Sequence, residues 1–247
     1  MINIALIGYG KMGRTIHEIA KNSFADSVNI NLIVDQHNRA ELTHEQLQQS
    51  DVAIEFTSPE SAIENIQFCF DANVPVVCGS TGWTKRLREF QIYAAENEKS
   101  FLYAPNFSIG VNIFFEINRQ LATIMDEHTS YDVNMEEIHH TEKKDAPSGT
   151  ALFAAFDILH RLHRKDGWKN RESSNAATLE IFSKREDSVP GTHTVKYFNE
   201  IDEIEIKHTA KNRNGFATGA LIAAKWLVDK KGAYTMEDVL GFNKNNI

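Results

Sequence analysis

Residues 2–13 have the sequence I-N-I-A-L-I-G-Y-G-K-M-G, and this stretch decides the fold. Its first six residues form a short apolar run, which predicts a buried parallel strand. The rest is a G-x-G-x-x-G motif at Gly8, Gly10 and Gly13, and residues 14–22 follow with helical spacing. Strand, motif and helix in this order predict a nucleotide-binding turn. The first glycine makes the turn, the second lets the backbone approach a pyrophosphate, and the third lets helix and strand approach each other.

Further residues of the nucleotide site are expected where later strands end. Asp35 lies 22 residues after Gly13 at the end of a predicted strand, where a carboxylate accepts hydrogen bonds from ribose hydroxyls. Loops 79–82 and 104–107 also close predicted strands, and ligands bind at this sheet edge. The alternative interpretation is a glycine-rich turn with a surface aspartate and ordinary loops. The predicted contacts are Gly8, Tyr9, Gly10, Lys11, Met12, Gly13, Asp35, Gly79, Ser80, Thr81, Ala104, Pro105, Asn106 and Phe107.

The first hundred residues alternate between strand and helix patterns. Strands are predicted at 2–7, 28–34, 51–56, 75–78 and 101–103, and helices at 14–22, 60–73 and 85–98. This alternation predicts an α/β fold with a doubly wound parallel sheet.

The pattern changes after Ser108. A helix at 112–126, a strand at 131–138 and a helix at 150–164 precede strands at 178–183, 192–198 and 203–210, and helices at 219–230 and 236–242 end the chain. The polar segment 165–175 is predicted to be a mobile loop. Consecutive strands without helices between them predict a second, mostly antiparallel α+β domain.

The composition limits the partners. A chain of 247 residues with a formal net charge of −8 lacks the basic surface of a nucleic-acid binder. No apolar run approaches the roughly 20 residues of a membrane span, and the N-terminus lacks the basic region of a signal peptide. Cys69 and Cys78 have no metal-like spacing and indicate core thiols in a reducing compartment. We therefore expect a cytoplasmic protein with no nucleic-acid or membrane partner.

Residues 137–150, E-I-H-H-T-E-K-K-D-A-P-S-G-T, combine proton donors with anion-binding groups. Ser148 or Thr150 can cap the following helix, whose N–H groups and positive dipole end suit a substrate carboxylate. The pair Lys143 and Lys144 is otherwise ordinary solvated charge. A nucleotide turn followed by this loop predicts hydride transfer that is completed by protonation.

His139 and His140 do not predict a metal site. Adjacent residues of an extended chain point to opposite sides, and no third ligand follows at a suitable spacing. We therefore expect no metal.

The run from His139 to Leu152, H-H-T-E-K-K-D-A-P-S-G-T-A-L, resembles the substrate signature of the dihydrodipicolinate reductase family, whose members are also named 4-hydroxy-tetrahydrodipicolinate reductases. The resemblance spans essentially the whole chain. It extends to the motif at 8–13, to Phe56 and Thr57, which we add to the nucleotide site, and to the loops at 79–82 and 104–112.

The resemblance implies a role for each residue of the loop. His139 matches the proton donor or acceptor, Lys143 the other proton donor, and His140 a substrate contact. Gly149 and Thr150 match positions that hold a substrate carboxylate, and Ser148 stands beside them. The family reduces a cyclic unsaturated dicarboxylic acid to tetrahydrodipicolinate with NADH or NADPH in lysine biosynthesis, and its members are usually homotetramers.

The resemblance also implies the domain division. The last helix of the family returns to the nucleotide domain, so residues 1–108 and 215–247 are expected to form the dinucleotide-binding domain. Residues 109–214 are expected to form the substrate-binding and oligomerisation domain. This chain departs from the family in two places: the connection from Asp35 to Asp51 has little room for an extra strand, and Gly191-Thr192-His193 stands where many members carry Gly-Glu-His.

The choice of cofactor is expected to depend on two opposite charges. Asp35 repels the 2′-phosphate of NADPH, whereas Arg39 offsets much of that repulsion. We therefore expect NADH to be preferred and NADPH to be usable.

Two other functions fit parts of the sequence. Another two-domain nicotinamide dehydrogenase would more often use a lone lysine base than this His-His loop. A nucleotide-sensing regulator without catalysis would not need a complete proton-donor loop.

Overall fold

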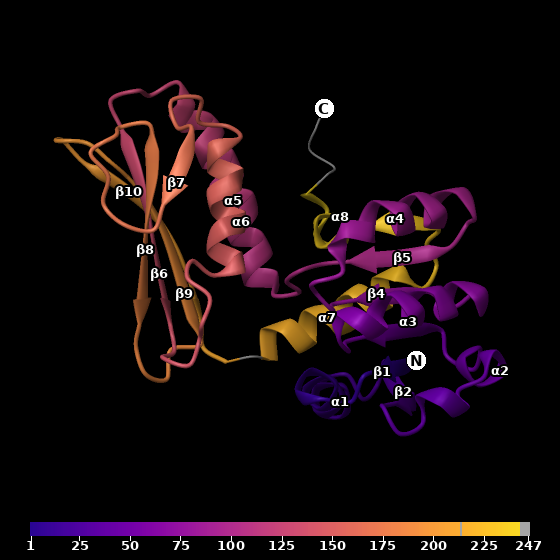
Figure 1. Ribbon diagram of the computed structural model, residues 1–247. Coiled ribbons are helices and arrows are strands. Elements are labelled where there is room, and N and C mark those ends of the chain that lie inside the picture. Colours follow the sequence, from indigo (N-terminus) through magenta and orange to yellow (C-terminus); the bar gives the residue numbers. More distant parts are fainter. Residues whose placement is uncertain (213, 243–247) are drawn as a thin grey trace. The chain divides into compact units, whose positions relative to one another are not determined.

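The chain divides into two compact units in the computed structural model, which describes residues 1–212 and 214–242 (Figure 1). Unit 1 comprises Met1–Ile109 and Asn214–Ile247, and unit 2 comprises Gly110–Arg213. Of the domain ranges expected from the sequence, residues 213 and 243–247 lie outside the described residues.

Unit 1 contains a six-stranded sheet in the order β11-β5-β4-β3-β1-β2, with every pair parallel. Its strands are β1 (Ile2–Ile7), β2 (Val28–Val34), β3 (Val52–Glu55), β4 (Val76–Cys78), β5 (Ser100–Tyr103) and β11 (Gly232–Tyr234). The register aligns Ile7 with both Val34 and Glu55, and Cys78 with both Glu55 and Tyr103. The carboxyl ends of five strands therefore lie along one edge of the sheet.

Helices cover both faces of this sheet, as the sequence predicted. Ile4 and Leu6 of β1 pack with α1 (Lys11–Ser23), α7 (Asn214–Leu227) and α8 (Met236–Leu240). Their neighbours Ala5 and Ile7 point to the other face and pack with α2 (His44–Leu47), α3 (Pro59–Asp71) and α4 (Leu87–Glu96). Successive side chains of a strand point to opposite faces, so a sheet that is apolar on both faces needs helices on both. The predicted doubly wound fold is confirmed.

The connection between β2 and β3 contains only two short helical elements. A single 3-10 turn, η1 (Arg39–Glu41), precedes α2, whose start is closed by reciprocal hydrogen bonds between Thr43 and Gln46. As expected from its length, this connection contains no extra strand.

Unit 2 contains a five-stranded sheet in the order β10-β9-β6-β8-β7. Its strands are β6 (Asp132–His139), β7 (Gly167–Lys169), β8 (Thr178–Arg185), β9 (Gly191–Phe198) and β10 (Glu203–Ala210). Pairs β6–β9 and β9–β10 are antiparallel, but pairs β6–β8 and β7–β8 are parallel. The prediction of a mostly antiparallel sheet was therefore wrong. For β6 and β8 the cause is α6 (Gly149–Leu159), which lies between them in the chain and forms the crossover that parallel strands require.

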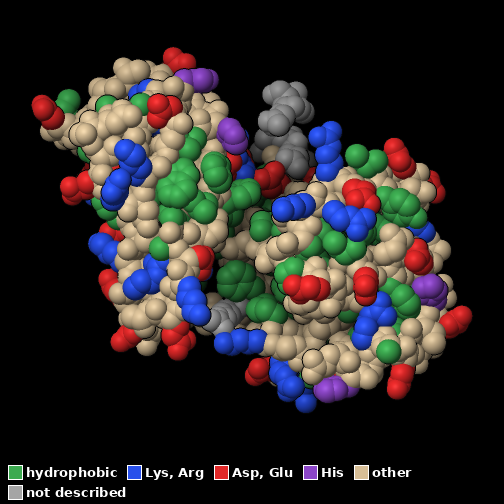
Figure 2. Space-filling model, viewed as in Figure 1, with side chains coloured by type: hydrophobic (Ala, Val, Ile, Leu, Met, Phe, Trp, Pro, Cys, Tyr) green, Lys and Arg blue, Asp and Glu red, His purple; other side chains and the backbone are tan. Residues whose placement is uncertain are grey.

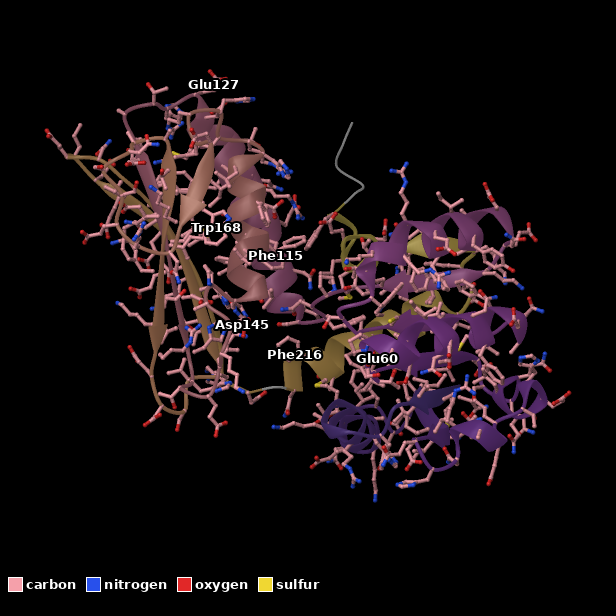
Figure 3. The ribbon with its side chains drawn as sticks, viewed as in Figure 1. Glu60, Phe115, Glu127, Asp145, Trp168 and Phe216 are labelled. Carbon is pink, nitrogen blue, oxygen red and sulfur yellow. The ribbon has the colours of Figure 1, made fainter. Side chains whose placement is uncertain are left out.

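Four further details differ from the sequence prediction. The helix expected at 150–164 ends at Leu159, and α7 begins at Asn214 rather than at residue 219. The segment expected to be a mobile loop contains β7, which pairs with β8 and carries Trp168 (Figure 3). Strand β11 was not predicted, because three residues are too few to show a period.

The core of unit 2 lies between its sheet and the helices α5 (Ile109–Asp126) and α6. Val133 and Met135 of β6 point into it, beside Val195 and Tyr197 of β9. Several apolar side chains remain exposed on the two helices, namely Ile113, Ile117, Ile124, Phe153 and Phe156. Figure 2 shows hydrophobic side chains at the surface of both units. Within the described residues, no helix is both long enough and apolar enough to cross a membrane.

Candidate active site

The glycine-rich turn lies between β1 and α1 in unit 1. Gly8 has φ +102°, and a Cβ there would lie 2.0 Å from the carbonyl oxygen of Phe56. A Cβ on Gly13 would lie 2.1 Å from the carbonyl oxygen of Gly8, so helix and strand meet backbone to backbone. A Cβ on Gly10 would meet no other atom within 4 Å. The first and third glycines are thus required by the fold, whereas the second keeps an open surface for a ligand.

The start of α1 is suited to an anion. Gly10 is the N-cap residue, and no side chain caps this end of the helix. No acidic residue lies in the first turn either. The N–H groups of a first helical turn have no partners within their helix and stand at the positive end of its dipole. The residues present therefore fit the pyrophosphate of a dinucleotide.

A cavity of about 500 Å³ opens beside this turn, within unit 1. Six residues that the sequence predicted line it, together with residues of the β2–η1 connection and of α3. Its lining consists of Ile7, Gly8, Tyr9, Gly10, Arg14, Val34, Asp35, Gln36, His37, Arg39, Phe56, Thr57, Ser58, Ser61 and Asn65. Of the motif, Lys11, Met12 and Gly13 lie in the first turn of α1 and do not line the cavity.

Charges of both signs face this cavity. The Asp35 carboxylate accepts a hydrogen bond from the backbone N–H of His37 at 2.8 Å. The guanidinium of Arg14 lies 5.1 Å from the centre of the Tyr9 ring. Arg39 donates from Nε to Oδ1 of Asn65 at 2.7 Å. One carboxylate and two guanidinium groups thus line the cavity, in a place that suits a ribose with or without a phosphate.

The other strand-end loops lie next to one another. A Cβ on Gly79 would overlap the Phe56 ring at 2.2 Å, and the rings of Phe56 and Phe107 lie 5.7 Å apart. The hydroxyl of Ser80 accepts a hydrogen bond from the backbone N–H of Thr57 at 2.8 Å. Parts of the predicted segments 56–57, 79–81 and 104–107 therefore meet along one sheet edge, although 79–81 and 104–107 do not line the cavity.

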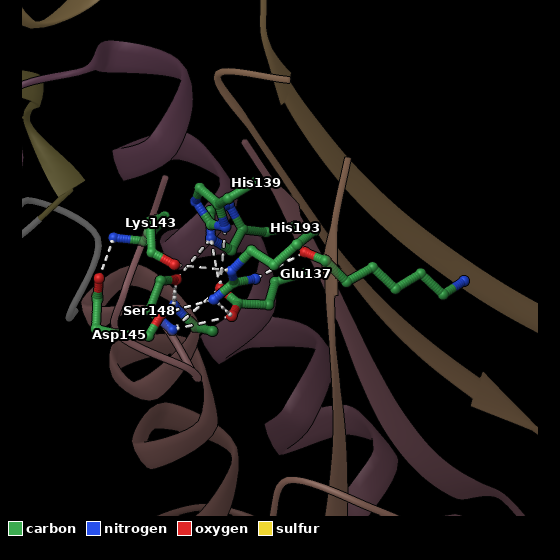
Figure 4. Close-up of polar contacts among 9 residues, drawn as sticks. Glu137, His139, Lys143, Asp145, Ser148 and His193 are labelled. Carbon is green, nitrogen blue, oxygen red and sulfur yellow. Dashed lines mark hydrogen bonds and ion pairs between the residues drawn. The ribbon is translucent and has the colours of Figure 1, made fainter. Parts of the chain in front are cut away.

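The second cluster lies at the carboxyl end of β6 in unit 2 (Figure 4). Glu137 and His139 are two residues apart on the strand, so their side chains share the face that points to the helices. The antiparallel register places His193 of β9 opposite Glu137, and the parallel register places Arg185 of β8 opposite His139. Sheet pairing therefore brings together residues that are up to 56 positions apart in the chain.

Glu137 is the centre of this cluster and is fully buried. Both of its oxygens accept from the backbone N–H of Ser148 at 3.1 Å, and Arg185 lies 3.3 Å from Oε1. Nδ1 of His139 lies 3.2 Å from Oε2. Burial alone would raise the pKa of Glu137, but hydrogen bonds from His139 and Ser148 outweigh it and hold the pKa well below its usual range. Glu137 is therefore a buried anion that is held by several donors.

His193 is held as a neutral ring. Burial, with the neighbouring His139 as a second cause, lowers the pKa of His193 to about 3. Its Nε2 lies 3.1 Å from the hydroxyl of Ser148, and its ring packs edge to face against His139 with centroids 5.0 Å apart. His193 thus supports the ring of His139 without adding positive charge.

The remaining loop residues lie nearer the surface. Lys143 pairs with Asp145 at 2.8 Å, on the loop that leads into α6 (Figure 4). The hydrogen bond from Lys143 lowers the pKa of Asp145. His140 points away from His139 and lines a cavity of about 250 Å³ with Glu142, Ser188, Val189, Pro190 and Asn212. The opposite orientation of the two histidines is the one expected from their adjacency.

Ser148 caps the following helix, which the sequence allowed for either Ser148 or Thr150. Its side chain is buried, caps α6 by accepting from the N–H of Ala151 at 3.2 Å, and meets His193. Gly149 is exposed and Thr150 is half-buried at the start of the same helix. Gly149 and Thr150 thus remain open to a ligand, whereas the hydroxyl of Ser148 is used within the protein.

Glu137, His139 and His193 have ligand atoms within 4.8 Å of one another, a spacing that a metal ion could bridge. The charge of Glu137 is already matched by Arg185, and its oxygens already accept from Ser148. A cation added here would lie beside a guanidinium group. The donor set is therefore better explained as a hydrogen-bonded anion than as a metal centre.

Comparison with known proteins gives concordant matches. Residues 2–107 match the family model described as dihydrodipicolinate reductase, N-terminus, and residues 110–240 match the C-terminus model of the same family. The 4-hydroxy-tetrahydrodipicolinate reductase of Christiangramia forsetii is 46% identical over 239 residues, which cover 97% of this chain and 98% of that protein. The protein of the same name from Methanococcoides burtonii is 36% identical, over 93% of this chain and 86% of its own. A solved structure, dipicolinate-bound dihydrodipicolinate reductase from Paenisporosarcina sp. TG-14, has a TM-score of 0.80 and 25% identity, covering 96% of this chain and 99% of that one.

Proposed function

We propose that this chain, which belongs to the dihydrodipicolinate reductase family, reduces 4-hydroxy-tetrahydrodipicolinate to tetrahydrodipicolinate in the diaminopimelate route of lysine biosynthesis. The family uses nicotinamide dinucleotides. The observation that carries the proposal is the buried cluster around Glu137. This cluster contacts His139 and Ser148, which both lie in the stretch that resembles the family's substrate signature.

The glycine turn and its cavity fit the dinucleotide. Backbone N–H groups at the start of α1 would hold the pyrophosphate, and Asp35 would accept from the ribose hydroxyls. When bound, the cofactor supplies a hydride. We propose that NADH is preferred and that NADPH is also used, because Asp35 and Arg39 line the same cavity with opposite charge.

His139 and Lys143 are the proposed proton donors. The contact of Nδ1 of His139 with the Glu137 carboxylate leaves Nε2 as the nitrogen that exchanges protons. Lys143 carries a second proton beside Asp145. Backbone N–H groups of Gly149 and Thr150, with the Thr150 hydroxyl, would hold a substrate carboxylate at the start of α6, and His140 would contact the substrate.

The Paenisporosarcina reductase was solved with dipicolinate bound. That molecule is a planar dicarboxylate, so the likeness supports a small dicarboxylate substrate for this chain. We propose in addition a cytoplasmic homotetramer. The apolar side chains exposed on α5 and α6 support self-association, although scattered exposed apolar residues are common. Sedimentation velocity should give about four times the chain mass of 28.0 kDa, and a mass of one chain would contradict the tetramer.

The test of the function is NADH oxidation with freshly generated substrate, followed by the loss of absorbance. His139→Gln and Lys143→Met should each lower kcat by roughly 10²–10⁴-fold, because a positioned acid contributes about that factor. Pyridine-2,6-dicarboxylate should compete with the substrate. A rate that requires a hydroxy acid and NAD⁺ instead would favour another nicotinamide dehydrogenase, and nucleotide binding without turnover would favour a regulator.

A further inference from the structure

A line of hydrogen bonds runs under the nucleotide cavity and ends at Arg39. Glu55 is fully buried at the end of β3, and its Oε1 accepts from both the backbone N–H and the hydroxyl of Thr57. The hydroxyl of Thr57 accepts in turn from Nδ2 of Asn65 at 3.3 Å. Oδ1 of Asn65 then accepts from Nε of Arg39 at 2.7 Å. All of these contacts lie within unit 1.

The direction of each bond in this line is fixed by the one before it. A threonine hydroxyl has one proton, and Thr57 gives it to Glu55, so towards Asn65 this hydroxyl is an acceptor. The amide of Asn65 must therefore turn its NH₂ group to Thr57 and its oxygen to Arg39. The reversed amide would place donors against the N–H of arginine, which has no acceptor. The carboxylate of Glu55 thus determines how Asn65 faces Arg39.

Arg39 is held on two sides as a result. Asn65 is buried, with 3% of its surface exposed, and fixes the Nε edge of the guanidinium. The ring of Phe68 on α3 lies under its plane, with the guanidinium carbon 4.5 Å from the ring centre. Arg39 and Asn65 both line the cavity that also contains Asp35. An arginine held by its Nε edge and one face still has its terminal nitrogens to offer, and a planar fork of this kind suits a phosphate.

We infer that Asn65 is a specificity-determining residue, which acts by positioning Arg39 for the 2′-phosphate of NADP-type cofactors. The inference rests on the proposed nucleotide site. It adds the contact between Asn65 and Arg39, which allows a chain with Asp35 to accept a 2′-phosphate. No glycine motif or strand-end rule specifies Asn65, because it lies in the middle of α3. Its contribution is preorganisation: an arginine that is already ordered loses less freedom when the phosphate binds.

The test compares two small adenine nucleotides by isothermal titration. Adenosine 2′,5′-bisphosphate carries the extra phosphate and AMP does not. Asn65→Leu should weaken binding of the bisphosphate by about 3- to 10-fold, the value of ordering one long side chain, and should change AMP binding by less than about twofold. Gln67→Leu is the matched control. The amide of Gln67 lies on the same helix and donates to Asp71, and Gln67 does not line the cavity. It should change neither affinity.

A double-mutant cycle separates positioning from a merely structural effect. In an Arg39→Ala background, Asn65→Leu should have no further effect on the bisphosphate, because the residue that it positions is gone. Phe68→Leu removes the ring that packs against Arg39. It should therefore also lower the affinity for the bisphosphate relative to the affinity for AMP. It gives a second reading should Asn65→Leu fail to fold.

Four outcomes would overturn the inference. Equal loss of AMP and bisphosphate affinity would make Asn65 structural, and so would an undiminished effect in the Arg39→Ala background. An unchanged ratio in both Asn65→Leu and Phe68→Leu would show that Arg39 needs no positioning. If the unaltered protein bound neither nucleotide, the nucleotide site itself would fail, and the inference with it.

Discussion

At the scale of single residues, the site of unit 2 depends on the burial of one carboxylate. A buried anion is costly unless donors surround it. Ser148, His139 and Arg185 meet that requirement for Glu137, whereas His193 beside it remains neutral. The two groups respond to acid at different pH, which makes their contributions separable.

The pH dependence of stability follows from these two shifts. The pKa of His193 is about 3 in the folded protein against 6.5 ordinarily. Between these two values the unfolded chain binds a proton at His193, and the folded chain does not. Its stabilisation is present above pH 6.5 and is lost as pH falls. The pKa of Glu137 is also lowered, but its stabilisation is lost only below its ordinary pKa of 4.5. The interval from about pH 6.5 to about pH 5 therefore separates His193 from Glu137, although His208, whose pKa burial also lowers, contributes in the same interval.

We expect the free energy of unfolding in urea to fall by about 1–2 kcal/mol between about pH 6.5 and about pH 5 from this group, at roughly 1.36 kcal/mol per pKa unit. His193→Gln removes the titrating ring, so its stability should fall less over the same interval. Equal slopes for the two proteins would show that His193 does not stay neutral in the folded state.

The residues of this cluster also mark where sequence reasoning stops. His139 and Lys143 stand out in the loop and Glu137 begins the same stretch, but no local pattern marks Arg185 as part of a site. His193 is distinguished only by its place in a departure from the family pattern. Their grouping depends on strand register, which a single sequence does not specify for distant strands. The spacing of Glu137 and His139 is the one available signal, since residues two apart on a strand share a face.

At the scale of elements, the glycine turn separates a folding role from a binding role. A Cβ on Gly13 would lie 2.1 Å from a backbone oxygen, whereas a Cβ on Gly10 would meet nothing within 4 Å. Gly13→Ala should therefore destabilise the protein by about 1–3 kcal/mol, the usual cost of overpacking. Gly10→Ala should leave stability within about 0.5 kcal/mol but weaken NADH binding at least about tenfold, since its methyl group occupies the ligand's approach. Urea unfolding and NADH fluorescence titration measure the two effects, and similar behaviour of both variants would refute this separation.

The start of α6 offers a second comparison between elements. Ser148 and Ser58 both cap helices, α6 and α3, but only Ser148 also meets a buried histidine. Loss of a cap costs about 0.5–2 kcal/mol, and an unpaired buried partner adds about 1 kcal/mol or more. Ser148→Ala should therefore destabilise the protein more than Ser58→Ala in urea unfolding. Equal losses would mean that the contact with His193 contributes nothing.

Prediction of the elements succeeded where the pattern was long. The strands β1, β2 and β10 have the predicted bounds. Largely apolar segments mark β1 and β2, and an alternation of charged and apolar residues marks β10. The three-residue strands β7 and β11 were missed, because they form only by pairing with a neighbour that the local sequence does not reveal. The early end of α6 also depends on contacts with distant residues. Beyond Leu159 the chain bonds to groups outside the helix; for example, Lys165 donates to the carbonyl of Ala176 at 2.7 Å.

At the scale of the whole molecule, the chain order of elements was enough to predict the fold class. Alternation indicated the doubly wound sheet, and the change of pattern after Ser108 indicated a second sheet. The strand order β10-β9-β6-β8-β7 could not be obtained in this way, because a helix between two strands allows a parallel return and consecutive strands do not exclude one. The helices and strands of each unit were therefore more predictable than the order and direction of the strands in the second sheet.

The two units have separate cores, and the chain passes between them near Ile109 and again near Asn214. If unit 1 holds the nucleotide and unit 2 the dicarboxylate, each ligand should slow amide hydrogen exchange in its own unit. A ligand at about 100 times its dissociation constant stabilises the binding state by about 2.7 kcal/mol. NADH should therefore protect the ends of β1 and β3 and the start of α1, measured by mass spectrometry of peptides.

Pyridine-2,6-dicarboxylate, added without nucleotide, should instead protect residues 137–150 and the start of α6. Gly10→Ala is the control, since it should weaken the first pattern at the same NADH concentration and leave the second unchanged. Protection of both units by either ligand alone would mean that the units open together, and that the division of the chain does not divide its binding. Protection of unit 1 by the dicarboxylate alone would place the substrate site elsewhere and would remove the proposed role of the loop that follows β6.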